Sequence, residues 1–127
     1  MSICVAFNLS DGVVIAVDSA TTLTDSSGAI TKVFLDASKL FQLGSLRVGI
    51  ATYGLGAIDG RTIGSFVREF TLEPTNNDIA TLSVEQIVER LRAFFFQHYK
   101  DFAEKLYGTA FDQIPDNMKG ILGLERF

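Results

Sequence analysis

A serine stands directly behind the initiator methionine of this 127-residue chain. Methionine before a small residue is normally removed, and its removal would leave Ser2 with a free α-amine. An α-amine has a pKa of about 8, so near neutral pH it can act as a base. One residue would then supply both a hydroxyl nucleophile and the base that activates it. The simpler interpretation is that Ser2 is an ordinary terminal residue, because many proteins begin Met-Ser.

Two residues of opposite charge could set the protonation of such a nucleophile. Asp18 follows the apolar run 13–17 and could orient a neighbouring ammonium group, or it could simply be the first residue of a loop. Lys39 opens the apolar segment 39–43. If Lys39 lies beside Ser2, its positive charge lowers the pKa of the amine and assists the hydroxyl. Otherwise its ammonium group extends to solvent, as lysines at strand ends usually do.

Gly54 lies between a predicted strand and a predicted helix. Glycine lets a backbone N–H approach a substrate closely, and a helix N-terminus favours negative charge, so Gly54 is a candidate oxyanion donor. The alternative is a plain turn residue. The only histidine, His98, is expected to be structural, and the only cysteine, Cys4, to be a buried thiol in a strand. One residue of each kind does not predict a metal site, and we expect no cofactor.

Two hairpins are predicted to position these residues. Residues 3–7 and 13–17 are rich in β-forming residues, and the loop between them contains an Asp-Gly turn signal. The continuous apolar run 13–17 predicts a strand that is buried on both faces. Residues 39–43 and 46–52, joined by a Gly-Ser turn, predict the second hairpin.

The segment between the two hairpins is polar and rich in small residues. Residues 18–31 therefore predict a loop along the edge of the sheet, and residues 32–35 a short strand or a supporting loop.

The first predicted helix follows residues 53–56. Asp59 is expected in its first turn, where an acid favours the helix dipole, and residues 74–78 end it. Its apolar face is formed by residues at helical spacing, namely Ile63, Phe66, Val67 and Phe70.

The second predicted helix has clearer start and stop signals. Ser83 and Gln86 form a capping box, Leu82 can pack on Ile87, and Gly108 ends the helix. An apolar stripe follows Ile87, Leu91, Phe94, Phe95, His98, Phe102 and Leu106. The order hairpin, hairpin, helix, helix predicts an α+β fold in which two antiparallel helices stack on a sheet.

Composition excludes several classes of protein. The net charge is -4 and no cluster of Lys and Arg is present, so we expect no nucleic-acid partner. No apolar run approaches the roughly 20 residues that cross a bilayer, so we expect no membrane partner. The N-terminus lacks the pattern of a secretory signal, and a single cysteine fits a reducing compartment. These features predict a soluble cytoplasmic protein.

Taken in order, several segments resemble the proteasome β-subunit family. They are Ser2, Asp-Gly-Val-Val-Ile-Ala-Val-Asp at 11–18, Ser-Ala-Thr-Thr at 19–22, Lys-Leu-Phe-Gln at 39–42 and Gly-Ile-Ala-Thr-Tyr-Gly-Leu-Gly at 49–56. That family includes the bacterial HslV-type peptidases and belongs to the N-terminal nucleophile hydrolases. The resemblance runs from Ser2 to about residue 107, and the stretches around Asp18 and Gly54 carry it in combination.

The resemblance implies a role for each candidate residue. Ser2 corresponds to the family's N-terminal threonine nucleophile. Asp18 and Lys39 correspond to the acid and the lysine that set its protonation, and Gly54 to the glycine whose N–H serves the oxyanion hole. Serine carries the same hydroxyl as threonine but lacks the methyl group that helps to fix the rotamer.

Further positions correspond to substrate-binding residues of the family. Thr22 matches a residue whose main chain pairs with an extended peptide substrate. The specificity pocket is shaped by the positions that match Thr21, Phe41, Thr52 and Gly56. Small residues at 52 and 56 leave that pocket open, so no side-chain preference is predicted.

The fold implied by the resemblance is the four-layer αββα sandwich of the N-terminal nucleophile hydrolases. Residues 1–127 would form a single domain of this type, incomplete at the C-terminus, with two β-hairpins and two antiparallel helices. Residues 112–119 predict a loop and residues 120–124 the start of a further strand. The family's later strands, outer helices and further acid and serine near the nucleophile have no counterpart in this chain.

The function implied is that of a serine-type peptidase that cleaves peptide bonds through an acyl-enzyme. The expected partners are a peptide or protein substrate and further copies of the chain in a ring or related homo-oligomer, and the resemblance allows an unfoldase partner. One alternative is a non-catalytic assembly subunit or an inactive fragment. Another is an unrelated small-molecule-binding module of similar layering.

Overall fold

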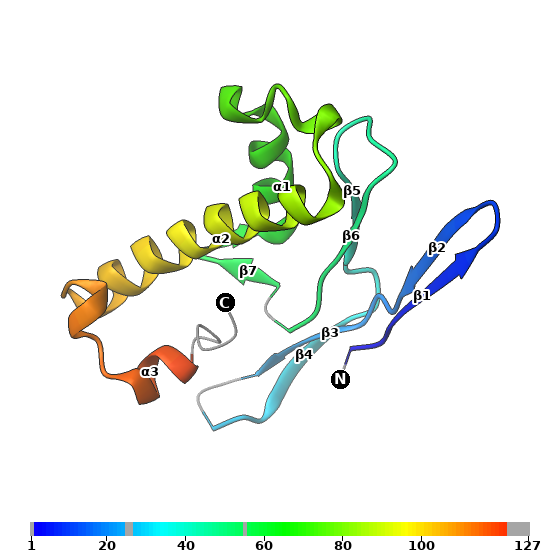
Figure 1. Cartoon of the computed structure of the whole chain (residues 1–127). Coiled ribbons are helices and arrows are strands. Elements are labelled where there is room, and N and C mark those ends of the chain that lie inside the picture. The colour runs from blue at the N-terminus through cyan, green and yellow to red at the C-terminus, as the bar shows by residue number, and fades with distance from the viewer. Residues whose placement is uncertain (1, 25–26, 55, 122–127) are drawn as a thin grey trace.

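The computed structural model describes residues 2–24, 27–54 and 56–121, which form a mixed α+β structure of antiparallel hairpins and helices (Figure 1). The hairpins are β1 (Cys4–Leu9) with β2 (Gly12–Val17), β3 (Thr21–Thr24) with β4 (Ile30–Phe34), β5 (Leu40–Gln42) with β6 (Gly49–Ala51), and β7 (Ala57–Ile58) with β8 (Arg61–Thr62). The helices are α1 (Ile63–Leu72), α2 (Val84–Tyr107) and α3 (Asp116–Ile121), with 3-10 turns at Pro74–Asn76, Ile79–Thr81 and Phe111–Gln113.

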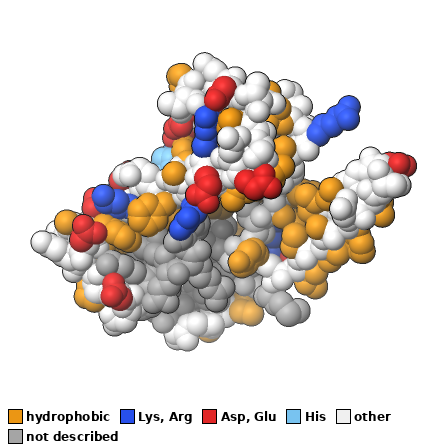
Figure 2. Space-filling view, in the orientation of Figure 1, with side chains coloured by type: hydrophobic (Ala, Val, Ile, Leu, Met, Phe, Trp, Pro, Cys, Tyr) orange, Lys and Arg blue, Asp and Glu red, His pale blue; other side chains and the backbone are white. Residues whose placement is uncertain are grey.

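The first predicted hairpin is confirmed, but its predicted burial is wrong. β1 and β2 pair from Cys4↔Val17 to Leu9↔Gly12, so β1 extends two residues beyond the expected end at residue 7. Val13 is 63% exposed and Val14 50% exposed. The hairpin projects from the rest of the molecule, and Figure 2 shows hydrophobic side chains along it. Ile15 and Val17 of β2 are partly buried beside β6, whereas the other apolar residues of the hairpin, Cys4 included, are exposed.

Residues 18–31, which were predicted to form a loop, instead contain most of the hairpin of β3 and β4. β3 and β4 pair antiparallel, with Thr21 opposite Phe34 and Thr22 opposite Val33. Threonine is polar, but its β-branched side chain favours extended backbone. The loop prediction was wrong because it considered only the polarity of these residues. Of the expected loop, residues 25–26 lie outside the described residues.

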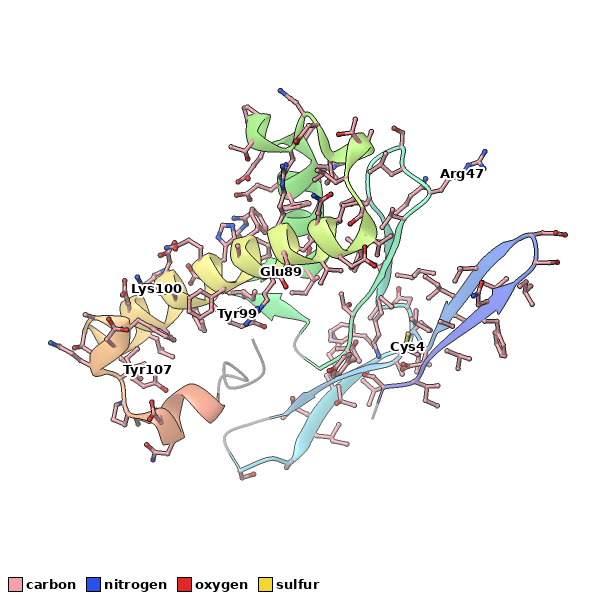
Figure 3. The ribbon with its side chains drawn as sticks, viewed as in Figure 1. Cys4, Arg47, Glu89, Tyr99, Lys100 and Tyr107 are labelled. Carbon is pink, nitrogen blue, oxygen red and sulfur yellow. The ribbon has the colours of Figure 1, made fainter. Side chains whose placement is uncertain are left out.

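The hairpin formed by β5 and β6 is confirmed and shorter than predicted. Leu40 pairs with Ala51 and Gln42 with Gly49. Gly44 adopts a φ of 58°, which suits glycine in the turn, and Arg47 extends into solvent at the tip (Figure 3). Leu43 is fully buried, so this hairpin packs into the core, and β2 lies beside β6.

The start of α1 lies later than predicted. Asp59 is in the turn between β7 and β8, not in the first turn of the helix. Asp59 and Gly60 both have positive φ, 47° and 76°, which is the backbone of a tight hairpin turn and the usual role of Asp-Gly. α1 begins at Ile63, where the Thr62 side chain accepts a hydrogen bond from the Ser65 N–H.

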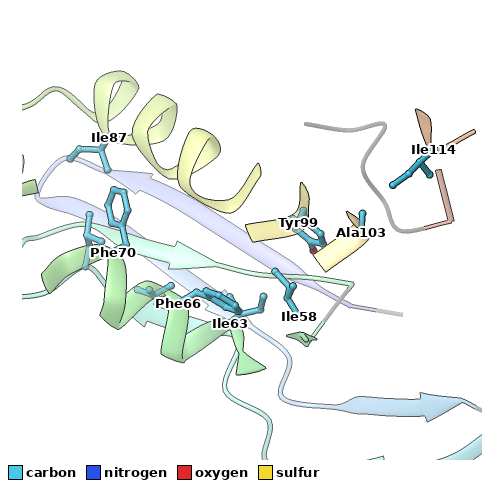
Figure 4. Packing of buried hydrophobic residues seen from close by; sticks show 10 residues of the cluster. Ile58, Ile63, Phe66, Phe70, Ile87, Tyr99, Ala103 and Ile114 are labelled. Carbon is cyan, nitrogen blue, oxygen red and sulfur yellow. The ribbon is translucent and has the colours of Figure 1, made fainter. Parts of the chain in front are cut away.

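The main core lies between α1 and α2. The predicted face of α1 is confirmed, since Ile63, Phe66, Val67 and Phe70 are all buried. Rings of α2 pack against it: Phe94 lies 6.4 Å from Phe66 and 5.3 Å from Phe70 between ring centroids. Figure 4 shows the two helices passing in opposite directions, with Ile58 and Ile114 completing the cluster.

The predicted capping signals of α2 are confirmed. Ser83 and Gln86 form both hydrogen bonds of a capping box, and Gly108 ends the helix with a left-handed φ of 64°. His98 packs against the rings of Phe66 and Phe94, as expected for a structural histidine. Leu106 is exposed, so the apolar stripe ends before it.

Two further expectations are wrong. In the part of the chain that the structure describes, the strands form separate hairpins rather than one sheet beneath the helices. The predicted loop 112–119 contains a 3-10 turn and most of α3, because buried Ile114 anchors this segment to the core. α3 also occupies residues 120–121 of the expected strand, and residues 122–124 lie outside the described residues.

Candidate active site

The Asp18 carboxylate is fixed at the open end of the first hairpin. Its backbone N–H donates to the Ile3 carbonyl at 3.0 Å, which extends the ladder of β1 and β2 by one residue pair. The Ile3 N–H donates to Asp18 Oδ1 at 2.8 Å. Both main-chain groups of Ile3 are therefore bound to Asp18, and this pairing holds the preceding residue, Ser2, beside the carboxylate.

Lys39 reaches the same place from the second predicted hairpin. Its carbonyl accepts a hydrogen bond from the Thr52 N–H at 2.8 Å, which closes the base of β5 and β6. Its ammonium donates to Asp18 Oδ2 at 2.8 Å and to the Ala20 carbonyl. The Lys39 side chain is 10% exposed and that of Asp18 23% exposed, so the ion pair is well shielded from solvent.

The third acceptor of Lys39 is the Ser2 hydroxyl. Nζ lies 3.3 Å from Ser2 Oγ, at the long end of hydrogen-bond distances. An ammonium has three N–H donors, and here it meets three oxygen atoms, from Ser2, Asp18 and Ala20. Because the lysine donates to Oγ, the hydroxyl proton is free to pass to another base.

The environment of Asp18 stabilises its charged form. Its pKa is lowered below the ordinary value of 3.8, first by the hydrogen bond from Lys39 and then by the N–H of Ile3, against a smaller opposing effect of desolvation. A carboxylate that remains ionised at neutral pH keeps the Lys39 ammonium in place beside Ser2.

A pocket of about 870 Å³ opens next to this cluster, and Lys39 belongs to its wall. That volume lies within the usual range of ligand pockets, about 300–1,000 Å³. The predicted residues that line it are Thr21, Thr22, Lys39, Phe41, Thr52, Gly54 and Gly56. Ser2 and Asp18 are not among the lining residues, so Lys39 connects the polar cluster to the pocket.

Gly54 lies on the pocket wall with a φ of 78°, a conformation that favours glycine. Among the described residues it forms no hydrogen bond with Ser2, Asp18 or Lys39. The predicted helix N-terminus does not follow Gly54 directly, because β7 and β8 intervene. The first turn of α1 nevertheless reaches the same pocket through Thr62, Ile63 and Gly64.

Some groups of the site were missed from the sequence. The Ala20 carbonyl binds Lys39, but a backbone acceptor has no sequence signal. Phe34 lines the pocket from the end of β4. Residues 30–34 carry a sequence signal for a strand, because all of them except Lys32 are β-branched or aromatic.

Comparisons with protein-family models, with curated protein sequences and with solved structures found no match to this chain. Within the residues that the structure describes, no helix has the length and apolar character needed to cross a membrane.

Proposed function

We propose that this protein is an N-terminal serine nucleophile hydrolase of the proteasome-like type, which cleaves peptide bonds through an acyl-enzyme on Ser2. The observation that carries the proposal is the hydrogen-bond cluster in which the Lys39 ammonium joins Ser2 Oγ and Asp18 beside a pocket. Three segments far apart in sequence supply these groups, and each segment is one that the family resemblance singles out. The described residues would then be the N-terminal portion of an αββα sandwich.

The proposed reaction begins after removal of Met1. The Ser2 Oγ attacks the carbonyl carbon of the peptide bond, and its proton passes to the α-amine of Ser2, directly or through a water. The Lys39 ammonium stabilises the developing negative charge at Oγ, and Asp18 holds that ammonium in place. The Gly54 N–H would stabilise the oxyanion of the tetrahedral intermediate.

The proton then passes to the leaving amine, the C–N bond breaks and an ester forms on Ser2. Water hydrolyses this ester and restores the hydroxyl. The substrate would bind as an added strand along β3, which is hydrogen-bonded only to β4 among the described residues.

Turnover of a fluorogenic peptide by three variants tests the proposal. Ser2→Ala lacks the nucleophile and should lose all measurable turnover while keeping the wild-type circular dichroism spectrum and melting curve. Ser2→Thr keeps a hydroxyl and should retain turnover. Ser10→Ala, in the exposed turn after β1, is the matched control and should be fully active. Turnover that survives in Ser2→Ala would contradict the proposal.

A second candidate is a non-catalytic assembly subunit of the same type. The exposed apolar side chains of β1 and β2 favour it, because such surfaces on soluble proteins often mark protein interfaces. A folded protein that keeps Met1, turns over no peptide and still self-associates would support this function instead.

A further inference from the structure

The pocket beside Lys39 has an uneven chemical lining. Its large side chains include Phe34, Phe41 and Ile63, and the remainder are mostly glycine, alanine and residues with hydroxyl groups. Lys39 is the single charged residue among the lining residues that the structure describes. The lining therefore decides which kind of substrate side chain can be buried there.

Lys39 is not available to a substrate carboxylate. Its three N–H donors face Ser2, Asp18 and Ala20. An acidic side chain in the pocket would meet a cation whose charge Asp18 already balances. Burying an uncompensated charge is costly, so acidic side chains are disfavoured.

Basic side chains are disfavoured because the pocket offers them no negative charge. No carboxylate lines the described pocket, and Asp18, the acid of the neighbouring cluster, is bound to Lys39 and Ile3. Apolar side chains remain, since their burial against phenylalanine rings is favourable.

The two phenylalanines come from different hairpins and are held by different contacts. Phe41, on β5, packs tightly on the first turn of α1, because a Cβ at Gly64 would lie only 2.8 Å from its Cε1. Phe34 is half-buried at the end of β4, where the Lys32 ammonium lies 4.6 Å from its ring centroid. Both rings line the pocket from partly buried positions, so they are suited to contact a bound side chain.

We propose that this pocket selects a bulky apolar side chain at the residue whose carbonyl is attacked, and that Phe34 is a specificity-determining residue. The inference rests on the proposed function and extends it to a substrate class. Phe34 contacts the substrate side chain. Because the Lys39 ammonium is paired with Asp18, the pocket does not attract an acidic substrate side chain.

The test compares four fluorogenic peptides that differ only in carrying Phe, Leu, Glu or Arg before the scissile bond. The kcat/KM for Phe and Leu should exceed that for Glu and Arg by at least about tenfold, as expected when one uncompensated charge must be buried. Equal rates, or a preference for Glu or Arg, would overturn the inference.

Substitutions at Phe34 and at its neighbour test the contribution of Phe34 to substrate binding separately from that of the surrounding residues. Phe34→Ala should raise KM for the Phe peptide several-fold with a smaller effect on kcat, and Ser2 should still be labelled by a small uncharged β-lactone. The control is Leu35→Ala, at a side chain that is 73% exposed and does not line the pocket. An unchanged KM in Phe34→Ala would overturn the role of Phe34.

A substitution that creates activity towards a new substrate tests the inference without relying on a loss of activity. Ala57→Glu places a carboxylate on the pocket wall and should raise kcat/KM for the Arg peptide. If the β-lactone labels Ser2 but no apolar peptide is preferred, the specificity inference fails and the proposed function stands. If Ser2 is not labelled at all, both fail.

Discussion

At the scale of single residues, the Asp18 carboxylate is bound by groups from two hairpins. Lys39 and the Ile3 N–H lower its pKa below 3.8, so its binding stabilises the folded state above that pH and the stabilisation is lost as pH falls through the lowered pKa. We therefore expect Asp18→Asn to lower the free energy of unfolding at neutral pH. The difference from wild type should shrink towards zero as the pH falls below 3.8.

Urea unfolding of both proteins across this pH range measures the effect. Lys39→Met supplies the control background, in which Asp18→Asn should cost less because its main partner is gone. A difference between the wild type and the Asp18→Asn variant that grows as the pH falls would contradict the assignment.

Residue types alone left ordinary roles open for Ser2, Asp18 and Lys39. The family resemblance predicted that they share a site, and the structure brings these side chains together. The sequence could not give the Ala20 carbonyl as a third partner of Lys39, because every residue carries such a group. It also could not give the contact of Gly64 with Phe41, since that depends on how α1 meets β5.

At the scale of elements, α2 depends on its N-terminal cap. The Ser83 side chain accepts from the Gln86 N–H, and the Gln86 side chain accepts from the Ser83 N–H. Ser83→Ala removes the cap and should lower the free energy of unfolding by about 1 kcal/mol. Ser83→Asp keeps a capping oxygen and should stay close to wild type in the same urea titration. Equal losses in both variants would show that the cap is not the cause.

Elements with strong local signals were predicted well. The capping box and Gly108 set the ends of α2, and helical spacing gave the buried face of α1. The prediction was wrong where two local sequence signals favoured different structures. Asp59-Gly60 forms a hairpin turn although an acid there also suits a helix start, and the threonines of β3 form a strand although their polarity suggested a loop.

At the scale of the whole molecule, the projecting hairpin carries an uncovered apolar face. Alternation along β1 places Ile3, Val5, Phe7 and Leu9 on one side, and all four are exposed. Residues 2–17 contain one charged side chain, Asp11 in the turn. A second copy of the chain can therefore pack against this face without burying a charge, and we propose that the face is a contact between copies of the chain.

Sedimentation velocity tests this proposal. The wild type should sediment as an oligomer of the 13.9 kDa chain, and Phe7→Lys should shift it towards the monomer because the new ammonium would be buried at the contact. Val88→Lys, at an exposed position on α2, is the matched control and should leave the oligomer intact. A wild-type protein that is monomeric at all concentrations would rule out the contact.

The arrangement of layers was the least predictable level. Short-range patterns gave an α+β structure with antiparallel hairpins, but burial of the run 13–17 was inferred from hydrophobicity alone. Hydrophobicity favours a covering layer without specifying which segment supplies it. Burial on both faces was therefore the wrong inference from residues 13–17.

The proposed reaction requires Ser2 to be an activated N-terminal nucleophile. The intact mass of the purified protein before and after treatment with a β-lactone tests this claim. We expect Met1 to be absent and one stoichiometric adduct to map to Ser2 in wild type, with no adduct in Ser2→Ala. Retention of Met1, or a folded wild-type protein that forms no adduct, would contradict the claim.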